Sequence, residues 1–312
     1  MTRNKTKYLA FALSCVLLVA CSGKDDKQTA VESPGEDAVA ATEASSDAGA
    51  ENTDVTNEDF NYIKLECDDE KNIDLGSDGE MDSLILTYES KDWGDSYSLK
   101  TNDQVLDLIS EDESNLCESV NAYFVHKPTG DYLIVDRNGF SNLVDVILYQ
   151  WDNGSFAEKD RIENMAVSQD AESICEDHVI LCTYCTAFGN WNLCKEYSYD
   201  DSGFSTQEKF SKVLPGYGGS KELTLKQSLT LTDENGTPTN TLEAGQKIIP
   251  NEANDTYAVG TKNTMSFVSE SGDPLGYITY EYVSNGESEY PSSVTVNGVS
   301  EDDLFENIEH VG

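Results

Sequence analysis

The chain is short of basic residues: its 312 residues include 20 lysines and arginines against 59 aspartates and glutamates, a net charge of −39. Nucleic acids are bound by basic surfaces, so this balance excludes them as direct partners. It also argues against docking on an anionic lipid surface through charge. With 10 Phe, 16 Tyr and 3 Trp, the chain nevertheless has enough apolar surface to fold. Its length suits roughly two domains of about 150 residues each.

Motifs of common catalytic sites are also missing. The three histidines, His126, His178 and His310, include no H-E-x-x-H, and no G-x-S-x-G, phosphate-binding loop or G-x-G-x-x-G occurs. Paired acids abound, but among 59 acids their adjacency says little about acid–base chemistry. We therefore predict that the protein is not an enzyme. An extracytoplasmic hydrolase that uses carboxylates of the middle of the chain is the alternative.

The apolar run at the N-terminus is too short to span a bilayer comfortably. It covers Tyr8–Ala20, thirteen residues, and follows a basic start, which is typical of a signal peptide. It ends in Leu18-Val19-Ala20-Cys21, which resembles the lipobox of bacterial lipoproteins. The resemblance implies that residues 1–20 are a signal peptide and that Cys21 becomes a lipidated N-terminus. An ordinary secretory signal with a chance cysteine is the alternative.

Residues 21–59 contain no aromatic residue. Beyond Cys21 they hold eleven acids and two lysines, so they cannot bury enough apolar surface to fold. We expect a disordered acidic stalk, with a disordered binding tail as the alternative. Loss of residues 1–20 leaves 17 basic residues against 59 acids, a mature charge of −42.

Two segments in the middle of the chain align without gaps at an offset of 48 residues, 132–156 and 180–204. They share an asparagine in the first turn and aromatic residues in the strands. The matched pairs are Asn142 with Asn190, Tyr149 with Tyr197, Trp151 with Tyr199 and Phe156 with Phe204. A fainter copy covers 84–99. Each unit is predicted to be strand, turn, strand, turn, because Asn, Asp and Gly in the turns tolerate positive φ.

These units resemble the β-propeller-like repeats of secreted bacterial proteins. The resemblance implies an antiparallel, propeller-like module over residues 60–214. Three units also fit a trefoil-like arrangement or an open stack of hairpins. Thr101–Cys117 and Arg161–Glu176, which lie between the copies, are expected to form short helices or outer strands.

An acidic loop, Asp74-Leu-Gly-Ser-Asp78-Gly79-Glu-Met-Asp82, precedes a predicted strand. It resembles the D-x-D-x-D-G-x-x-D calcium loop of integrin-type repeats. The resemblance implies that Asp74, Asp78 and Asp82 bind calcium and that Gly79 forms the turn. Gly76 stands where that family has a second aspartate. The alternative is an acidic turn without metal.

Six cysteines follow Cys21, an even number that is compatible with three disulfides. A two-residue turn at Gly189-Asn190 would make Cys185 and Cys194 cross-strand neighbours, which a disulfide can join. Cys67–Cys117 and Cys175–Cys182 would complete the set. The alternatives are buried free thiols, a zinc site formed by Cys175, Cys182, Cys185 and Cys194 with His178, or a redox C-x-x-C.

Residues 215–312 read as short strands separated by glycines, after a boundary rich in Gly and Pro. The strand motifs over 222–282 resemble bacterial SH3-like domains. The resemblance implies a small β-barrel that contacts wall peptides, with Tyr257 and Tyr277 as candidate ligand-binding residues or as core. The segment from Ser300 to His310 predicts one short amphipathic helix.

We therefore predict a mainly β protein with a propeller-like or trefoil-like module, an SH3-like barrel and a C-terminal helix. Its expected function is non-catalytic binding or scaffolding at the cell envelope, for wall glycan or peptide. The expected partners are the membrane, through the lipid, and the cell wall. Calcium is the one cofactor expected. A solute-capture lipoprotein is disfavoured because strands and helices do not alternate along the chain.

Overall fold

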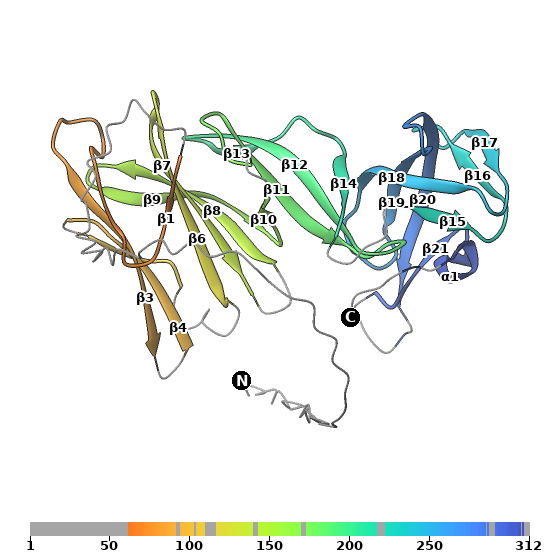
Figure 1. The fold of residues 1–312 in the computed structure, drawn as a ribbon, viewed down its shortest axis with the longest axis horizontal. Helices are drawn as coiled ribbons and strands as arrows, with labels where there is room; N and C mark the ends of the chain where they lie inside the picture. The colour runs from red at the N-terminus through yellow and green to blue at the C-terminus, as the bar shows by residue number, and fades with distance from the viewer. Residues whose placement is uncertain are drawn as a thin grey trace, which may run out of the picture. The chain divides into compact units, whose positions relative to one another are not determined.

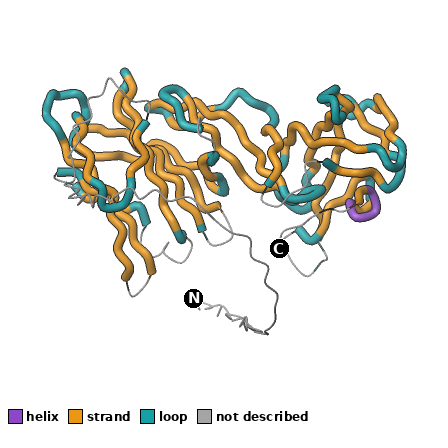
Figure 2. The backbone as a smooth tube through the Cα atoms, viewed as in Figure 1, coloured by secondary structure: helices purple, strands orange, loops and turns teal. Residues whose placement is uncertain are grey.

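The computed structural model of the chain consists mainly of antiparallel β-strands, as predicted (Figure 2). It describes residues 62–91, 94–102, 104–109, 117–139, 143–169, 173–216, 222–284, 286, 291–306 and 308. The predicted signal peptide, the stalk over 21–59 and Cys21 lie outside these residues. The described segments contain one helix, α1 (Glu301–Leu304).

The first half of the described chain forms two antiparallel sheets (Figure 1). The four-stranded sheet has the order β2-β3-β4-β5 and comprises β2 (Glu70–Ile73), β3 (Asp82–Lys91), β4 (Gly94–Lys100) and β5 (Val105–Asp107). The five-stranded sheet has the order β1-β6-β7-β8-β9 and comprises β1 (Ile63–Leu65), β6 (Ser119–Lys127), β7 (Gly130–Asn138), β8 (Leu143–Asp152) and β9 (Ser155–Glu163).

The rest of the chain forms a third sheet of 14 strands, whose main path is β10-β11-β12-β14-β18-β19-β20-β16-β17. Its strands are β10 (Ala166–Val167), β11 (His178–Cys185), β12 (Trp191–Asp200), β13 (Gly203–Ser205), β14 (Ser211–Pro215), β15 (Leu223–Leu225), β16 (Leu229–Thr232), β17 (Pro238–Leu242), β18 (Lys247–Asn254), β19 (Lys262–Val268), β20 (Pro274–Val283), β21 (Ser293–Val296), β22 (Val299–Ser300) and β23 (Phe305–Glu306). Over the residues described, no sheet closes into a barrel.

The middle of the five-stranded sheet is buried on both faces. Alternate residues of a strand point to opposite faces, and every residue of β7 from Asp131 to Arg137 is buried. One face contributes Phe124, Leu133, Val135 and Ile147 to a cluster that includes Leu84, Leu86 and Leu99 of the four-stranded sheet. The other contributes Val125, Ile134 and Leu148 to a cluster that includes Val179, Leu181 and Tyr199 of the third sheet.

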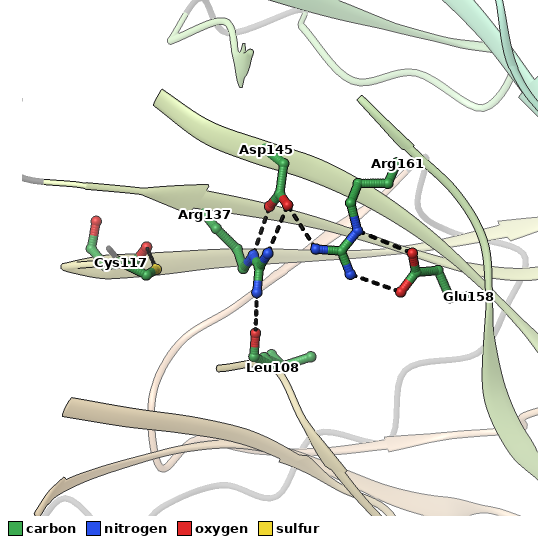
Figure 3. A network of polar contacts seen from close by, with 7 residues as sticks. Leu108, Cys117, Arg137, Asp145, Glu158 and Arg161 are labelled. Carbon is green, nitrogen blue, oxygen red and sulfur yellow. Dashed lines mark hydrogen bonds and ion pairs between the residues drawn. The ribbon is translucent and has the colours of Figure 1, made fainter. Parts of the chain in front are cut away.

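A charged network lies in the first of these clusters (Figure 3). Arg137 and Asp145 are cross-strand neighbours on β7 and β8, and Arg137 donates to both carboxylate oxygens of Asp145 at 2.6 Å. Arg137 also donates to the carbonyl of Leu108 at 3.2 Å. Arg161 donates to the carboxylates of Asp145 at 2.7 Å and of Glu158 at 2.9 Å, at the solvent side of the network. The arginine fork therefore links the five-stranded sheet to the segment that follows β5.

The hairpin β11–β12 inserts its tip into the C-terminal core. Phe188 is fully buried, has a φ of 61°, and has the rings of Tyr280 and Phe305 at 5.1 Å. Its N–H donates to Glu301 at 2.7 Å, and burial raises the pKa of that carboxyl to about 7. The boundary predicted between residues 214 and 215 lies inside β14, which pairs with β12 on one side and β18 on the other.

The C-terminal helix is confirmed but is shorter than the predicted segment from Ser300 to His310. It ends at Leu304 because Phe305 is extended and pairs with Leu225 of β15. The strand expected over Glu222–Leu231 is divided into β15 and β16. The segments between the repeat copies contain outer strands, β5 and β10, at the edges of their sheets.

The network predicts a large effect from one isosteric change. Asp145→Asn leaves Arg137 buried without its carboxylate, so we expect the free energy of unfolding to fall by about 3–5 kcal/mol. The control is Glu158→Gln, at a side chain 42% exposed. This control should lose less than about 1 kcal/mol. Guanidinium denaturation measures both, and equal losses would contradict the role given to Asp145.

Candidate functional site

A small aromatic cavity lies at the end of the β8–β9 hairpin, beside β4 and β5. Its volume is about 70 Å³. It is lined by Leu99, Thr101, Gln104, Val105, Leu106, Trp151, Ser155 and Phe156. Apolar and aromatic walls with a few polar groups are typical of small-ligand sites. We call these eight residues the aromatic cavity.

The β8–β9 turn sets the aromatic wall. Asn153 and Gly154 have φ values of 51° and 86°, which is the backbone that an Asn-Gly hairpin turn requires. The turn makes Trp151 and Phe156 cross-strand neighbours, with ring centroids 5.1 Å apart and nearly edge to face. The second turn expected in this repeat unit is therefore present at residues 152–154, and it presents both rings on one side of the hairpin.

The predicted calcium loop lies against Trp151. Gly76 has a φ of 78°, and a Cβ on it would lie 3.2 Å from the Trp151 indole nitrogen. Its N–H donates to the buried carboxylate of Asp131 at 2.6 Å, and Asp131 also bonds His126 Nδ1 at 2.6 Å. An aspartate at position 76, as in the calcium-loop pattern, would be strained by this φ and would crowd the Trp151 ring.

The three loop aspartates each accept a hydrogen bond from a different donor. Asp74 accepts from the Gly79 N–H at 3.1 Å, Asp78 from the Glu80 N–H at 2.9 Å, and Asp82 from Asn102 at 3.0 Å. In the described part of the chain, no three His, Cys, Asp or Glu side chains are grouped so that they could hold a metal ion. Calcium binding here stays a prediction.

The disulfide pairing predicted from the sequence is wrong. Cys182, not Cys185, faces Cys194 across β11 and β12, and these two form the disulfide. The prediction assumed a two-residue turn at Gly189-Asn190. The connection is instead the five-residue segment 186–190, in which Phe188 and Gly189 both have positive φ. Cys182 and Cys185 are three residues apart and therefore point to opposite faces of β11. Because Cys182 shares its face with Cys194, Cys185 cannot reach Cys194.

The other predicted cysteine pairs are also wrong. Cys175–Cys182 is excluded because Cys182 is bonded, and Cys67 and Cys117 are free thiols rather than a pair. Burial raises the pKa of the Cys117 thiol to about 11. The fully buried Cys185 donates to Asp255 at 3.0 Å. The four-cysteine zinc site is also excluded, since two of its sulfurs form the disulfide.

The two tyrosines predicted to bind ligand have different neighbours. Tyr257 is 48% exposed and its ring lies 5.1 Å from Tyr282. Tyr277 is half-buried in β20, with its ring 5.9 Å from Phe210. A ligand role for Tyr257 and Tyr277 stays a prediction.

The buried carboxylates of the middle of the chain are Asp131, Asp136 and Asp145. Burial raises the pKa of Asp136 to about 6, and Asn121 donates to it at 3.4 Å. All three lie in the five-stranded sheet, and none lines the aromatic cavity. The side chains that line the cavity carry hydroxyl, amide and apolar groups.

Comparison with protein-family models, curated proteins and solved structures found no match for this chain. Among the described residues, no helix is long and apolar enough to cross a membrane.

In the sequence, Trp151 and Phe156 stand out as aromatic residues of the repeat, but nothing in the repeat shows that they line a cavity. The Asn-Gly turn between them was the available signal. The rest of the wall, from Leu99 to Leu106, comes from the end of β4 and from the outer strand β5, whose position no local pattern reveals.

The disulfide assignment predicts a thiol count. A chain that begins at Ser22, denatured without reductant, should show four reactive thiols out of six cysteines, because only Cys182 and Cys194 are paired. A colorimetric thiol reagent with and without prior reduction gives both numbers. No reactive thiol would restore the three-disulfide scheme, and six would remove the disulfide altogether.

Proposed function

We propose that this protein is a lipid-anchored, extracytoplasmic binding protein that holds a cell-wall glycan without catalysis. The aromatic cavity is the observation that carries the proposal. Sugar rings have apolar C–H faces and polar rims, and the cavity offers two aromatic rings beside Thr101, Gln104 and Ser155. Its volume of about 70 Å³ suits a ring substituent rather than a whole sugar, so the glycan would lie over the mouth.

The aromatic wall of the cavity is held in place by neighbouring residues, which favours binding. Trp151 contacts both Gly76 and Phe156, and the Gly76 N–H donates to buried Asp131. A preformed aromatic wall loses little conformational entropy when ligand arrives. Gly76, through which this contact is made, belongs to the predicted calcium loop.

The propeller-like and SH3-like assignments are also part of this proposal. The hairpins β7–β8 and β11–β12 occupy the two aligned segments, with Trp151–Phe156 and Tyr199–Phe204 as equivalent cross-strand pairs. Both match the strand–turn–strand unit on which the propeller-like resemblance was based. The segment 222–282 would be the SH3-like module, with wall peptide as its expected contact.

The N-terminus supplies the location in this proposal. The lipobox at Cys21 would hold the protein on the membrane, and the acidic segment over 21–59 would set its folded part at a distance. The mature charge of −42 keeps the protein soluble and disfavours anionic partners that depend on charge.

Cys21→Ser tests the anchor. The wild-type chain should be found with the membrane and begin at a lipid-modified Cys21, as mass spectrometry of the mature N-terminus would show. The variant should be released from the membrane, since it lacks the sulfur that carries the lipid. An unmodified wild-type N-terminus downstream of Cys21 would contradict the anchor.

Retention on purified, insoluble cell wall tests the binding function. A chain that begins at Ser22 should be retained. Gln104→Ala should weaken retention about two- to tenfold, which is the range expected for one lost hydrogen bond, and Trp151→Phe should weaken it more. Gln207→Ala, at an exposed glutamine on another element, is the matched control.

Loss of retention of the wild-type chain at every salt concentration would overturn wall binding. Equal retention of all variants would show that the aromatic cavity is not the site. Release of new reducing ends from the wall would instead favour the hydrolase alternative. Thermal melts of each variant separate lost binding from lost folding.

A further inference from the structure

The residues that line the aromatic cavity are all uncharged, although the chain carries a net charge of −39. A charged group that enters such a cavity loses its water and finds no counterion, which is costly. Neither a carboxylate nor an ammonium group of a ligand therefore has a partner among these residues. The group that enters the cavity is expected to be neutral.

The size of the aromatic cavity limits what can enter it. Its volume is about 70 Å³, whereas one water molecule in the liquid occupies about 30 Å³. A single hydroxyl group would leave most of this space empty, and a whole sugar ring would not enter. An N-acetyl group, which consists of an N–H, a carbonyl and a methyl group, is of the right size.

The polar residues of the cavity suit an amide. Gln104 carries the one amide side chain among the lining residues. A carboxamide both donates and accepts hydrogen bonds, so it can pair with the carbonyl or the N–H of a second amide. The side chains of Thr101, Gln104 and Ser155 form no hydrogen bond with any other residue that the structure describes. Their donors and acceptors are therefore open to a ligand.

The turn that carries Gln104 is held in place by its neighbours. The Thr101 N–H donates to the carbonyl of Gln104 at 3.0 Å. Asn102 accepts from the Ser83 N–H at 2.9 Å and donates to Asp82 at 3.0 Å, which ties the turn to β3. An amide on a fixed turn loses little conformational freedom when a ligand arrives.

The apolar residues of the cavity suit a methyl group. The rings of Trp151 and Phe156 lie 5.1 Å apart, and Leu99 and Leu106 complete the apolar lining. Burial of one methyl group in such surroundings raises affinity about fourfold.

We propose that the aromatic cavity binds the N-acetyl group of an amino sugar, with Gln104 bonded to its amide and the Trp151 and Phe156 rings against its methyl group. This inference rests on the proposed function and specifies the ligand group at the same site. The neutral acetamido group, and not the sugar ring or its linkage, then decides which glycan is held. A free amino sugar is disfavoured because its ammonium group has no counterion in the cavity.

Calorimetric titration of the chain that begins at Ser22 with three soluble oligomers tests this inference. β-1,4-linked oligomers of N-acetylglucosamine, glucose and glucosamine share a linkage and differ in the substituent at one ring position. N-acetylglucosamine oligomers should bind about ten- to fiftyfold more tightly than glucose oligomers, the combined effect of one methyl group and one hydrogen bond. Glucosamine oligomers should bind no better than glucose oligomers in high salt, which screens their attraction to the acidic chain.

Gln104→Leu tests the hydrogen bond to the amide. It keeps a side chain of similar size without donor or acceptor, so the preference for N-acetylglucosamine over glucose oligomers should fall to about fourfold. Gln207→Leu, at an exposed glutamine elsewhere in the chain, is the matched control and should keep the full preference. Melting curves show whether each variant folds. If a variant does not fold, the wild-type comparison of the three oligomers still decides.

The results separate this inference from the proposed function. Equal binding of the three oligomers, or no binding of any, would overturn the inference, while retention on cell wall would still support the proposed function. Preference for N-acetylglucosamine oligomers without retention on the wall would contradict the proposed function and support the inference. A preference that Gln104→Leu leaves undiminished would also overturn the inference, because the acetamido group would then be read elsewhere.

Discussion

Strand β7 has no face toward water, and much of the described structure depends on how this constraint is met. Polar groups in such a strand must find partners inside the protein, because burying them unpaired is expensive. Asp131 and Arg137 lie at the two ends of β7. Both are on the same face of the strand as Leu133 and Val135, which is the face toward the four-stranded sheet. Asp131 binds Gly76 of the loop before β3, and Arg137 binds the carbonyl of Leu108 after β5. Each end of β7 is thereby tied to one side of the aromatic cavity.

This arrangement explains why the cavity keeps its shape. The loop held by Asp131 packs against Trp151, while the segment held by Arg137 follows directly on Val105 and Leu106, which also line the cavity. Buried ion pairs add little net stability compared with apolar residues, but they fix geometry when every charge is paired. The Arg137–Asp145 pair, both nearly inaccessible to water, fulfils that condition. The proposed binding function therefore rests on polar groups that do not touch the ligand.

The sequence revealed those parts of the fold that depend on short-range patterns. The strand–turn–strand units and the Asn153–Gly154 turn follow from alternation and turn residues. The segments that hold β5 and β10 were open between short helices and outer strands. The Cys185–Cys194 pairing failed because Phe188 occupies a backbone conformation that favours glycine, so the turn is longer than its Gly189-Asn190 suggests. Phe188 is held there by the C-terminal core and by Glu301, 113 residues away. The buried hydrogen bonds that Asp255 accepts were equally out of reach, since their donors, Cys185, Tyr280 and Tyr282, lie far apart along the chain.

Hydrogen exchange followed by mass spectrometry, with and without soluble fragments of wall glycan, tests most directly whether β7 anchors a binding cavity. The account predicts that β7 exchanges most slowly among the strands of the first two sheets, and that glycan slows exchange over residues 99–106 and 151–156. Exchange of β7 as fast as that of the edge strands β5 and β9, or protection confined to the third sheet, would contradict it.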